Sequence, residues 1–234
     1  MTKTLYLGGR RLEYTIERKR VKNLNLRISP DKGIYVSVRR GVTEAEIERF
    51  ILSKSDFILK TLDGFEKRER AVPEKTEDGK TVLLSGKRLT VRLKKGDDTV
   101  ALSENEIVVF AKGPENEEAK RKILERFFKE YCTQKILPIC EEIFEKSRIP
   151  GEKFPEIKFR KMRSRWGSCQ PKKRIITFST ALAFVPADCV YYVVAHEFSH
   201  LKIPNHSAAF YDEVAKFVPE WKTLRKKLSN YPIT

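Results

Sequence analysis

Hydrophobic and polar positions alternate over the first forty residues of the chain. Two alternating runs of aliphatic residues flank a polar turn, and they comprise Leu24, Leu26 and Ile28, then Ile34, Val36 and Val38. A period of two is typical of strands that bury one face. The pattern therefore predicts short antiparallel strands between about residues 4 and 38.

A helical pattern follows these strands. Thr43 is a suitable N-cap residue, and Glu46 stands three positions later, which is the spacing of a capping box. Ile47 and Ile51 then fall on one helical face. We expect one helix from Thr43 and a second helix over about residues 53–70.

The same order of signals recurs after a polar, turn-rich linker at residues 73–80. The segment 84–89 reads LSGKRL and resembles the segment 7–12, which reads LGGRRL. Alternating aliphatic residues follow in both places. Duplication of a unit made of hairpins and a helix would produce this pattern. Unrelated hairpins that share the same turn chemistry would produce it too.

A longer helical pattern covers about residues 115–146. Hydrophobic or thiol side chains recur every fourth residue along it, at Leu124, Phe128, Cys132, Ile136, Cys140 and Phe144. This spacing predicts one buried stripe, in which the two cysteines are small core residues. Pro138 lies inside the pattern and is expected to kink or divide the helix.

The composition is that of a strongly basic globular protein. The chain has 234 residues, a formal net charge of +16 and 40% hydrophobic residues, which excludes a disordered polyelectrolyte and a small disulfide scaffold. The excess of positive charge is +7 over residues 1–70 and +8 over residues 151–234. Such an excess favours polyanionic partners, although it also serves solubility.

Several classes of protein and site are not indicated. No hydrophobic run approaches the roughly 18 residues of a membrane span, and polar residues at 8–11 occupy the place of a secretory segment. The four cysteines include no C-x-x-C pair, so neither a zinc knuckle nor a redox pair is expected. We expect a cytoplasmic protein that binds no membrane, and its oligomeric state is unknown.

All three histidines of the chain lie within eleven residues, at His196, His200 and His206. On a helix, His196 and His200 share one face, where both imidazoles can bind one zinc ion. Glu197 stands beside the first histidine and can reach water at an open coordination position. Pro204 would end the helix and let His206 return as the third ligand. The sequence thus predicts one Zn²⁺ per chain, with Glu197 as general base.

Other residues near this motif are weaker candidates for the metal. Three downstream acids, Asp212, Glu213 and Glu220, could replace His206 as ligand, but they are better suited to contacting the imidazoles or to the surface. Cys169 is a poor ligand candidate, because a thiolate would fill the position that a hydrolytic site keeps open. The strand at 174–178 could bind an extended peptide if it presents a free edge.

Eight basic residues and no acidic residue occupy the segment 158–174. A solvated surface produces such a run, and so does a site for an anionic substrate or for nucleic acid. Arg165 in this flank is a candidate substrate-binding residue, and Arg165 or Tyr211 could stabilise an oxyanion. A second basic run, at residues 225–227, is interpreted as charge at the C-terminus of a helix.

A series of motifs surrounds the histidines: RWGSC at 165–169, a strand, an LxxxP turn at 182–186, YVVAHEFSH at 192–200 and NHS at 205–207. Together they resemble the YgjP-type, SprT-like family of zinc metallopeptidases, strongly over about residues 155–228 and loosely over the N-terminal half. The resemblance implies a zinc site at His196, His200 and His206 with Glu197 as general base. Membership of the metzincins is not expected, because Ile203 replaces their glycine and no methionine follows.

We therefore predict an α+β fold in two parts. A strand-rich N-terminal region covers residues 1–112, with helices at about 43–70, and a mostly helical, zincin-like catalytic domain with a small sheet covers 113–234. The predicted function is zinc-dependent hydrolysis of peptide bonds in a peptide or protein substrate. Two alternatives stay open: hydrolysis of an anionic small molecule, such as a nucleotide phosphoanhydride, at the same site, and a nucleic-acid-binding protein with a structural zinc.

Overall fold

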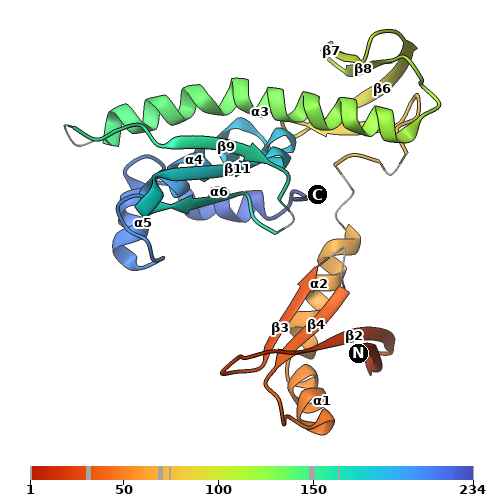
Figure 1. The fold of residues 1–234 in the computed structure, drawn as a ribbon, viewed down its shortest axis with the longest axis vertical. Coiled ribbons are helices and arrows are strands. Elements are labelled where there is room, and N and C mark those ends of the chain that lie inside the picture. The colour runs from red at the N-terminus through yellow and green to blue at the C-terminus, as the bar shows by residue number, and fades with distance from the viewer. Residues whose placement is uncertain are drawn as a thin grey trace. The chain divides into compact units, whose positions relative to one another are not determined.

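The computed structural model describes residues 2–29, 33–67, 71–73, 75–147, 151–162 and 164–233. Within these ranges it contains six α-helices and three small sheets, so the predicted α+β class is confirmed (Figure 1). The chain divides into two units, Met1–Glu69 and Arg70–Thr234. No helix among the described residues has both the length and the hydrophobicity needed to cross a membrane.

The first unit contains a four-stranded sheet in the order β1-β2-β4-β3. Its strands are β1 (Thr2–Leu7), β2 (Arg10–Arg18), β3 (Asn25–Ser29) and β4 (Gly33–Val38). Two hairpins supply the antiparallel pairs β1–β2 and β3–β4, whereas β2 and β4 pair in parallel. The expectation of antiparallel strands throughout is therefore wrong at this one pair, because the second strand of each hairpin runs in the same direction. Residues 30–32 of the predicted turn lie outside the described part of the chain.

Two helices complete the first unit, α1 (Glu44–Leu52) and α2 (Ser55–Lys67). The Thr43 hydroxyl accepts a hydrogen bond from the Glu46 amide, and the Glu46 carboxylate accepts one from the Thr43 amide, so the predicted capping box is confirmed. Ile47, Ile51 and Ile58 are fully buried in the core of this unit. Residues 68–70 of the second predicted helix lie outside the described ranges.

The second unit begins with a sheet of the same topology, in the order β5-β6-β8-β7. Its strands are β5 (Thr81–Leu84), β6 (Lys87–Lys95), β7 (Thr99–Leu102) and β8 (Glu106–Ala111). Again the two hairpins are antiparallel and their second strands pair in parallel. Shared turn chemistry explains similar hairpins but not the common order in which the four strands of each sheet associate. The structure therefore favours a duplicated unit.

This second sheet belongs to the same core as the helices that follow it. Val82, Val91 and Val109 are buried in one cluster with Phe128 and Leu182. The two units thus meet between residues 69 and 70, and the boundary predicted between residues 112 and 113 falls inside the second unit. The difference arises because the two sheets look alike in sequence, and only their tertiary contacts distinguish them.

The long helix α3 (Glu117–Ser147) is continuous, and the six residues of its predicted stripe are all buried. Pro138 was expected to kink or divide the helix; it lies inside it without dividing it, so the expectation of a division is wrong and a kink stays a prediction. The proline is exposed while its neighbours Ile136 and Cys140 are buried on the opposite side. The lost backbone hydrogen bond therefore faces solvent, and burial of the stripe holds the helix together.

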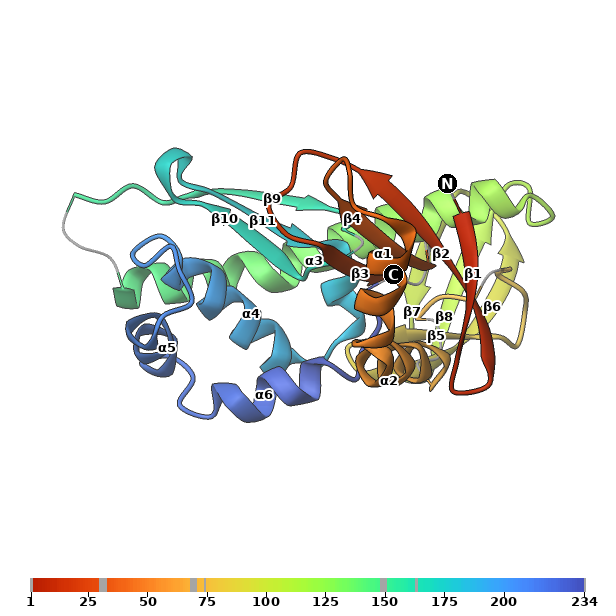
Figure 2. The same cartoon turned by 90° about the horizontal axis from the view of Figure 1, so that it is seen from below.

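A third sheet and three further helices complete the second unit. The sheet has the order β10-β11-β9, with β9 (Glu156–Arg160), β10 (Gly167–Gln170) and β11 (Ile175–Ser179). The helices are α4 (Ala187–Ser199), α5 (Ala208–Ala215) and α6 (Trp221–Leu228). Figure 2 shows α4 between the sheet and α6, in agreement with its contacts to β10 and α6. Because β11 is the central strand, the segment 174–178 does not present an edge, and the two edge strands of this sheet are β10 and β9.

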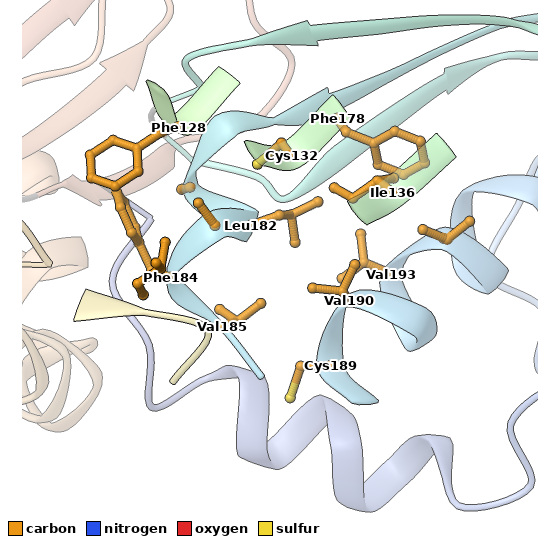
Figure 3. Close-up of a cluster of buried hydrophobic side chains, with 14 of the residues drawn as sticks. Phe128, Cys132, Ile136, Phe178, Leu182, Phe184, Val185, Cys189, Val190 and Val193 are labelled. Atoms are coloured by element: carbon orange, nitrogen blue, oxygen red, sulfur yellow. The ribbon is translucent and has the colours of Figure 1, made fainter. Parts of the chain in front are cut away.

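The core of the second unit fixes α4 in place. Figure 3 shows side chains of α3, β11, the segment at 180–185 and α4 converging on one cluster. Cys132 lies in this cluster, where burial raises the pKa of its thiol to about 12. The cysteines of the stripe are thus neutral core residues.

Truncation of Ile136 to alanine is expected to lower the free energy of unfolding by about 2–5 kcal/mol, because it leaves a cavity between α3 and α4. Urea denaturation of the full chain measures this loss. Leu102→Ala is the matched control, since that leucine is 44% exposed and its truncation should change stability by less than about 0.5 kcal/mol. Equal losses in the two variants would contradict the assigned core.

Candidate metal centre

The helix α4 carries the central motif into the interior of the second unit. Its buried positions lie on all sides, from Cys189 and Val190 through Val193, Val194 and Ala195 to Phe198 and Ser199. Such a helix needs partners around its whole circumference, which α3, α5, α6 and β10 provide. The last helical turn therefore holds His196 and Glu197 on a rigid, buried support.

The structure brings the three histidines together. One ring nitrogen from each of His196, His200 and His206 lies within 4.8 Å of the others, and this is the one such group of possible ligands in the described ranges. The ring centroids are 4.7 to 5.1 Å apart. The Nε2 atoms of His196 and His206 are separated by 3.1 Å. The side chains of His196 and His206, which are ten positions apart in the chain, thus point toward the same place.

This arrangement fits a metal ion. Two nitrogens bound to one tetrahedral zinc at about 2.0–2.1 Å lie roughly 3.3 Å apart, which is close to the observed 3.1 Å. The Nδ1 atom of His196 is buried and has no hydrogen-bond partner among the described residues. Burial, followed by the neighbouring His200 and His206, lowers the pKa of His196 to about 3. The His196 ring is therefore neutral at physiological pH, as a metal ligand must be.

The orientation of His200 is set by the turn behind it. Its Nδ1 donates a hydrogen bond to the carbonyl oxygen of Ile203 over 3.2 Å, which leaves the Nε2 lone pair free for a metal. Helix α4 ends at Ser199, and the Ile203 amide donates to the Ser199 carbonyl. The helix thus stops five residues before Pro204, earlier than predicted, because a tight turn begins at His200.

Phe210 forms an apolar wall against all three imidazoles. It is fully buried, stacks on His200 with a centroid distance of 4.4 Å, and meets His196 and His206 edge-on. These contacts restrict the orientation of the histidine rings. No pattern in the sequence indicates this role, because an aromatic residue on α5 is equally suited to an ordinary core.

The acidic residues proposed as alternative ligands lie outside the histidine cluster. Glu213 is buried and binds Lys202 over 2.9 Å as well as Lys216, so it connects α5 to the turn that leads to His206. Asp212 and Glu220 are exposed. Within the described residues, the structure therefore groups none of the three with the histidines.

Glu197 follows His196 on α4, and its side chain is tightly enclosed. Glu197 is only 6% exposed. Burial raises the pKa of its carboxyl group to about 8, although the positive charge of Arg165 opposes this rise. A Cβ atom at Gly167 would lie 2.7 Å from both Cγ and Oε1 of Glu197. The absence of a side chain at Gly167 thus makes the room that Glu197 occupies. In the sequence this glycine is visible only as part of the RWGSC motif at 165–169, which does not show what it meets.

Cys169 is two residues further along β10 and is not part of the histidine cluster. Burial, and then the charge of Glu197, raise the pKa of its thiol to about 12. A neutral thiol is neither a metal ligand nor a reactive group at physiological pH. These observations agree with the interpretation of Cys169 as a structural residue.

The basic flank at 158–174 is partly neutralised within the protein. Lys158 lies 3.0 Å from Glu156, Lys161 lies 3.2 Å from Glu125, and the guanidinium of Arg174 donates to the carbonyl oxygen of Lys153. Other members are exposed, namely Arg160, Arg165, Lys172 and Lys173. Arg163 lies outside the described residues. A role of the flank in binding nucleic acid stays a prediction.

A pair of residues from α5 and α6 forms a further wall of the site. Tyr211 stacks on Trp221 with centroids 4.1 Å apart, and Arg225 donates to the Tyr211 hydroxyl oxygen over 3.2 Å. The Tyr211 ring lies 6.2 Å from that of His206, and the positive charge of Arg225 contributes to the low pKa of His196. Arg225 was interpreted as helix-end charge because no sequence spacing links it to residues on another helix.

Loss of His206 is expected to weaken zinc binding by more than about 100-fold, because removal of even a supporting partner of a ligand costs about 10–100-fold. Competition with a chromophoric chelator measures the affinity of His206→Ala. Asn205→Ala is the control, since Asn205 is exposed in the same turn and should leave the affinity unchanged. Wild-type affinity in His206→Ala would remove that residue from the site.

A family model described as YgjP-like, metallopeptidase domain, matches residues 22–231. Among curated proteins no sequence match is found. Two similar solved structures are the metallopeptidase zymogens abylysin from Pyrococcus abyssi and jannalysin from Methanocaldococcus jannaschii, each 21% identical to this chain. The alignments cover 40% of this chain and 90% and 92% of theirs, with TM-scores of 0.36 and 0.35.

Proposed function

Since this chain belongs to the family of YgjP-like metallopeptidases, we propose that it hydrolyses peptide bonds with one zinc ion held by His196, His200 and His206. Membership of the family implies a catalytic metal. The observation that carries the proposal is the convergence of these three side chains beside a buried Glu197. Zinc, when bound at such a site, acts as a Lewis acid toward a carbonyl oxygen and toward water.

Glu197 is proposed as the general base. Its carboxylate takes a proton from the attacking water and later delivers it to the nitrogen of the leaving amine. Burial without a strong cationic partner raises the proton affinity of Glu197, which favours the first transfer. The close approach of Gly167 on β10 restricts where the carboxylate can lie.

The free edge of β10 is proposed to align the substrate. This strand includes Gly167 and Cys169, and among the described strands it pairs with β11 alone. An extended peptide can add to such an edge through backbone hydrogen bonds. The strand passes directly over Glu197, so the scissile bond of a peptide added there would lie close to the general base. The substrate is therefore expected to be an unfolded or flexible segment.

Tyr211 and Arg165 are proposed to contact the substrate around the reacting carbonyl. Arg225 donates to the oxygen of Tyr211, which leaves the hydroxyl hydrogen of Tyr211 free to donate to a substrate oxygen. Arg165 is exposed and close enough to Glu197 to oppose the rise of its pKa. Both groups can stabilise negative charge that develops in the transition state.

Metal removal and restoration tests this function. The full chain is purified without a histidine tag, stripped with a chelator and assayed before and after addition of one equivalent of zinc. We expect cleavage of a denatured, alkylated protein only after zinc is restored. In parallel, nucleoside triphosphates should not be hydrolysed. Turnover of nucleotides alone would favour phosphoanhydride hydrolysis, and turnover of neither substrate would favour a structural metal.

A further inference from the structure

Because β2 and β4 pair in parallel, their C-terminal ends lie together at one end of the first sheet, and a basic segment is found at each of them. Arg18 at the end of β2 is in register with Val38 at the end of β4. The Lys19 amide donates a hydrogen bond to the Val38 carbonyl over 2.8 Å, so the chain stays in contact just beyond the strands. Three consecutive basic residues, 18–20, begin with the last residue of β2, and two more, 39–40, directly follow β4.

These segments line a hollow of about 730 Å³ within the first unit. One lining residue is Val21, and the other six are basic: Arg18, Lys19, Arg20, Lys22, Arg39 and Arg40. Some of this charge is engaged, since Lys19 lies 2.7 Å from Glu17 and Arg18 donates to the Val42 carbonyl. Arg20, Lys22 and Arg40 are exposed, and no ion pair links them to an acid in the described ranges.

The fold itself does not require this concentration of positive charge. The second sheet has the same topology, and the corresponding end follows β6 and β8. That end carries Asp97 and Asp98 among its lysines. Lys112 lies 3.6 Å from Asp97, and its amide donates to the Asp98 carboxylate. The same topology thus carries nearly balanced charge at this place in the second sheet and strong positive charge in the first.

We propose that the basic hollow, defined by residues 18–22 and 39–40, binds the phosphate backbone of a nucleic acid duplex without reading its sequence. Four of its six cations are arginines, whose guanidinium groups match phosphate oxygens in bidentate geometry. No aromatic side chain lines the hollow, so it offers no platform for stacking the bases of a single strand.

A membrane surface fits the hollow less well than a duplex. Membrane-binding surfaces combine positive charge with hydrophobic side chains that enter the lipid. The exposed large hydrophobic residues described in the first unit are Tyr6, Leu52 and Phe57, and none of them lines the hollow. The hollow itself is lined by six basic residues and one valine. The site is independent of the metal centre, so its failure would leave the proposed peptidase function untouched.

Binding of a fluorescein-labelled DNA duplex of about 20 base pairs to the full chain tests this site across a salt series. The hollow variant combines Arg20→Gln, Lys22→Gln and Arg40→Gln, and it spares Arg39 because that residue lies near the helix cap at Glu46. The matched control combines Lys94→Gln, Lys95→Gln and Lys112→Gln at the corresponding end of the second sheet. Both variants lose the same net charge.

The hollow variant should bind at least tenfold more weakly at about 0.1 M salt, and its slope of log K against log salt should fall by about 2.7, since each phosphate contact contributes about 0.9. The control should stay close to wild type. Equal weakening of both variants, or no duplex binding by wild type, would overturn the proposal. It would also be overturned if the hollow substitutions abolished binding to phosphatidylserine vesicles and left duplex binding unchanged.

Discussion

Replacement of Glu197 by glutamine should lower kcat for peptide hydrolysis by about 10²–10⁴-fold, the usual contribution of a general base. The amide of glutamine has nearly the same size, so the buried space beside Gly167 stays filled. It cannot accept the proton of the attacking water, however. Because the three histidines are unchanged, the variant should still bind one zinc ion per chain.

Zinc content and kcat are to be measured on the same preparation of Glu197→Gln. Glu220→Gln is the matched control, because Glu220 is exposed and lies outside the histidine cluster. It should retain wild-type rate and metal. Undiminished hydrolysis by Glu197→Gln would exclude this residue as the base, and loss of the metal would show that it has a structural role instead.

Gly167→Ala should lower the rate of hydrolysis by about 100-fold while zinc binding persists. The new Cβ would lie 2.7 Å from Cγ and Oε1 of Glu197 and 2.8 Å from Cδ, which is shorter than van der Waals contact permits. The backbone of β10 is held by its pairing of Gly167 with Phe178. The carboxylate must therefore move, and small displacements of a catalytic group cost about 10²-fold in rate.

Gly113→Ala is the matched control for this substitution. A Cβ at Gly113 would meet the flexible end of the Glu115 side chain at 3.0 Å, which can move at little cost. We expect wild-type kcat and zinc content in the control. The melting temperature of both variants verifies that they are folded. Wild-type kcat in Gly167→Ala would show that Glu197 does not depend on the empty space at this glycine.

Local patterns in the sequence predicted much of the candidate site. His196, Glu197 and His200 are close in the chain, so helical periodicity alone places them together. His206 was linked to them because only a short turn separates it from the helix. The capping box at Thr43 and the buried stripe of α3 are equally local, and the structure confirms both.

Contacts between distant segments could not be predicted in this way. Gly167 meets Glu197 only because β10 crosses α4, and Arg225 reaches Tyr211 from another helix. The parallel pairing of β2 with β4 likewise depends on how two hairpins associate, since each hairpin considered alone suggests antiparallel neighbours. Such contacts are tertiary, and a single sequence carries no periodic signal for them.

The division of the chain into two structural units likewise depends on contacts between distant segments. Both sheets show similar alternation and similar turns, so their sequences suggested one strand-rich region. Burial of Val82 and Val91 in the core of α3 and α4 places the second sheet with the helices instead. The likeness in sequence reflects shared topology and not a shared core.

All three histidines of the chain are proposed to hold one metal ion beside Glu197. Anomalous X-ray diffraction at the zinc absorption edge, from crystals of the zinc-loaded protein, tests it most directly. We predict a single strong peak within about 2.0–2.1 Å of one nitrogen of each of His196, His200 and His206. A peak at Cys169 or at an acidic residue, with none among the histidines, would contradict the claim.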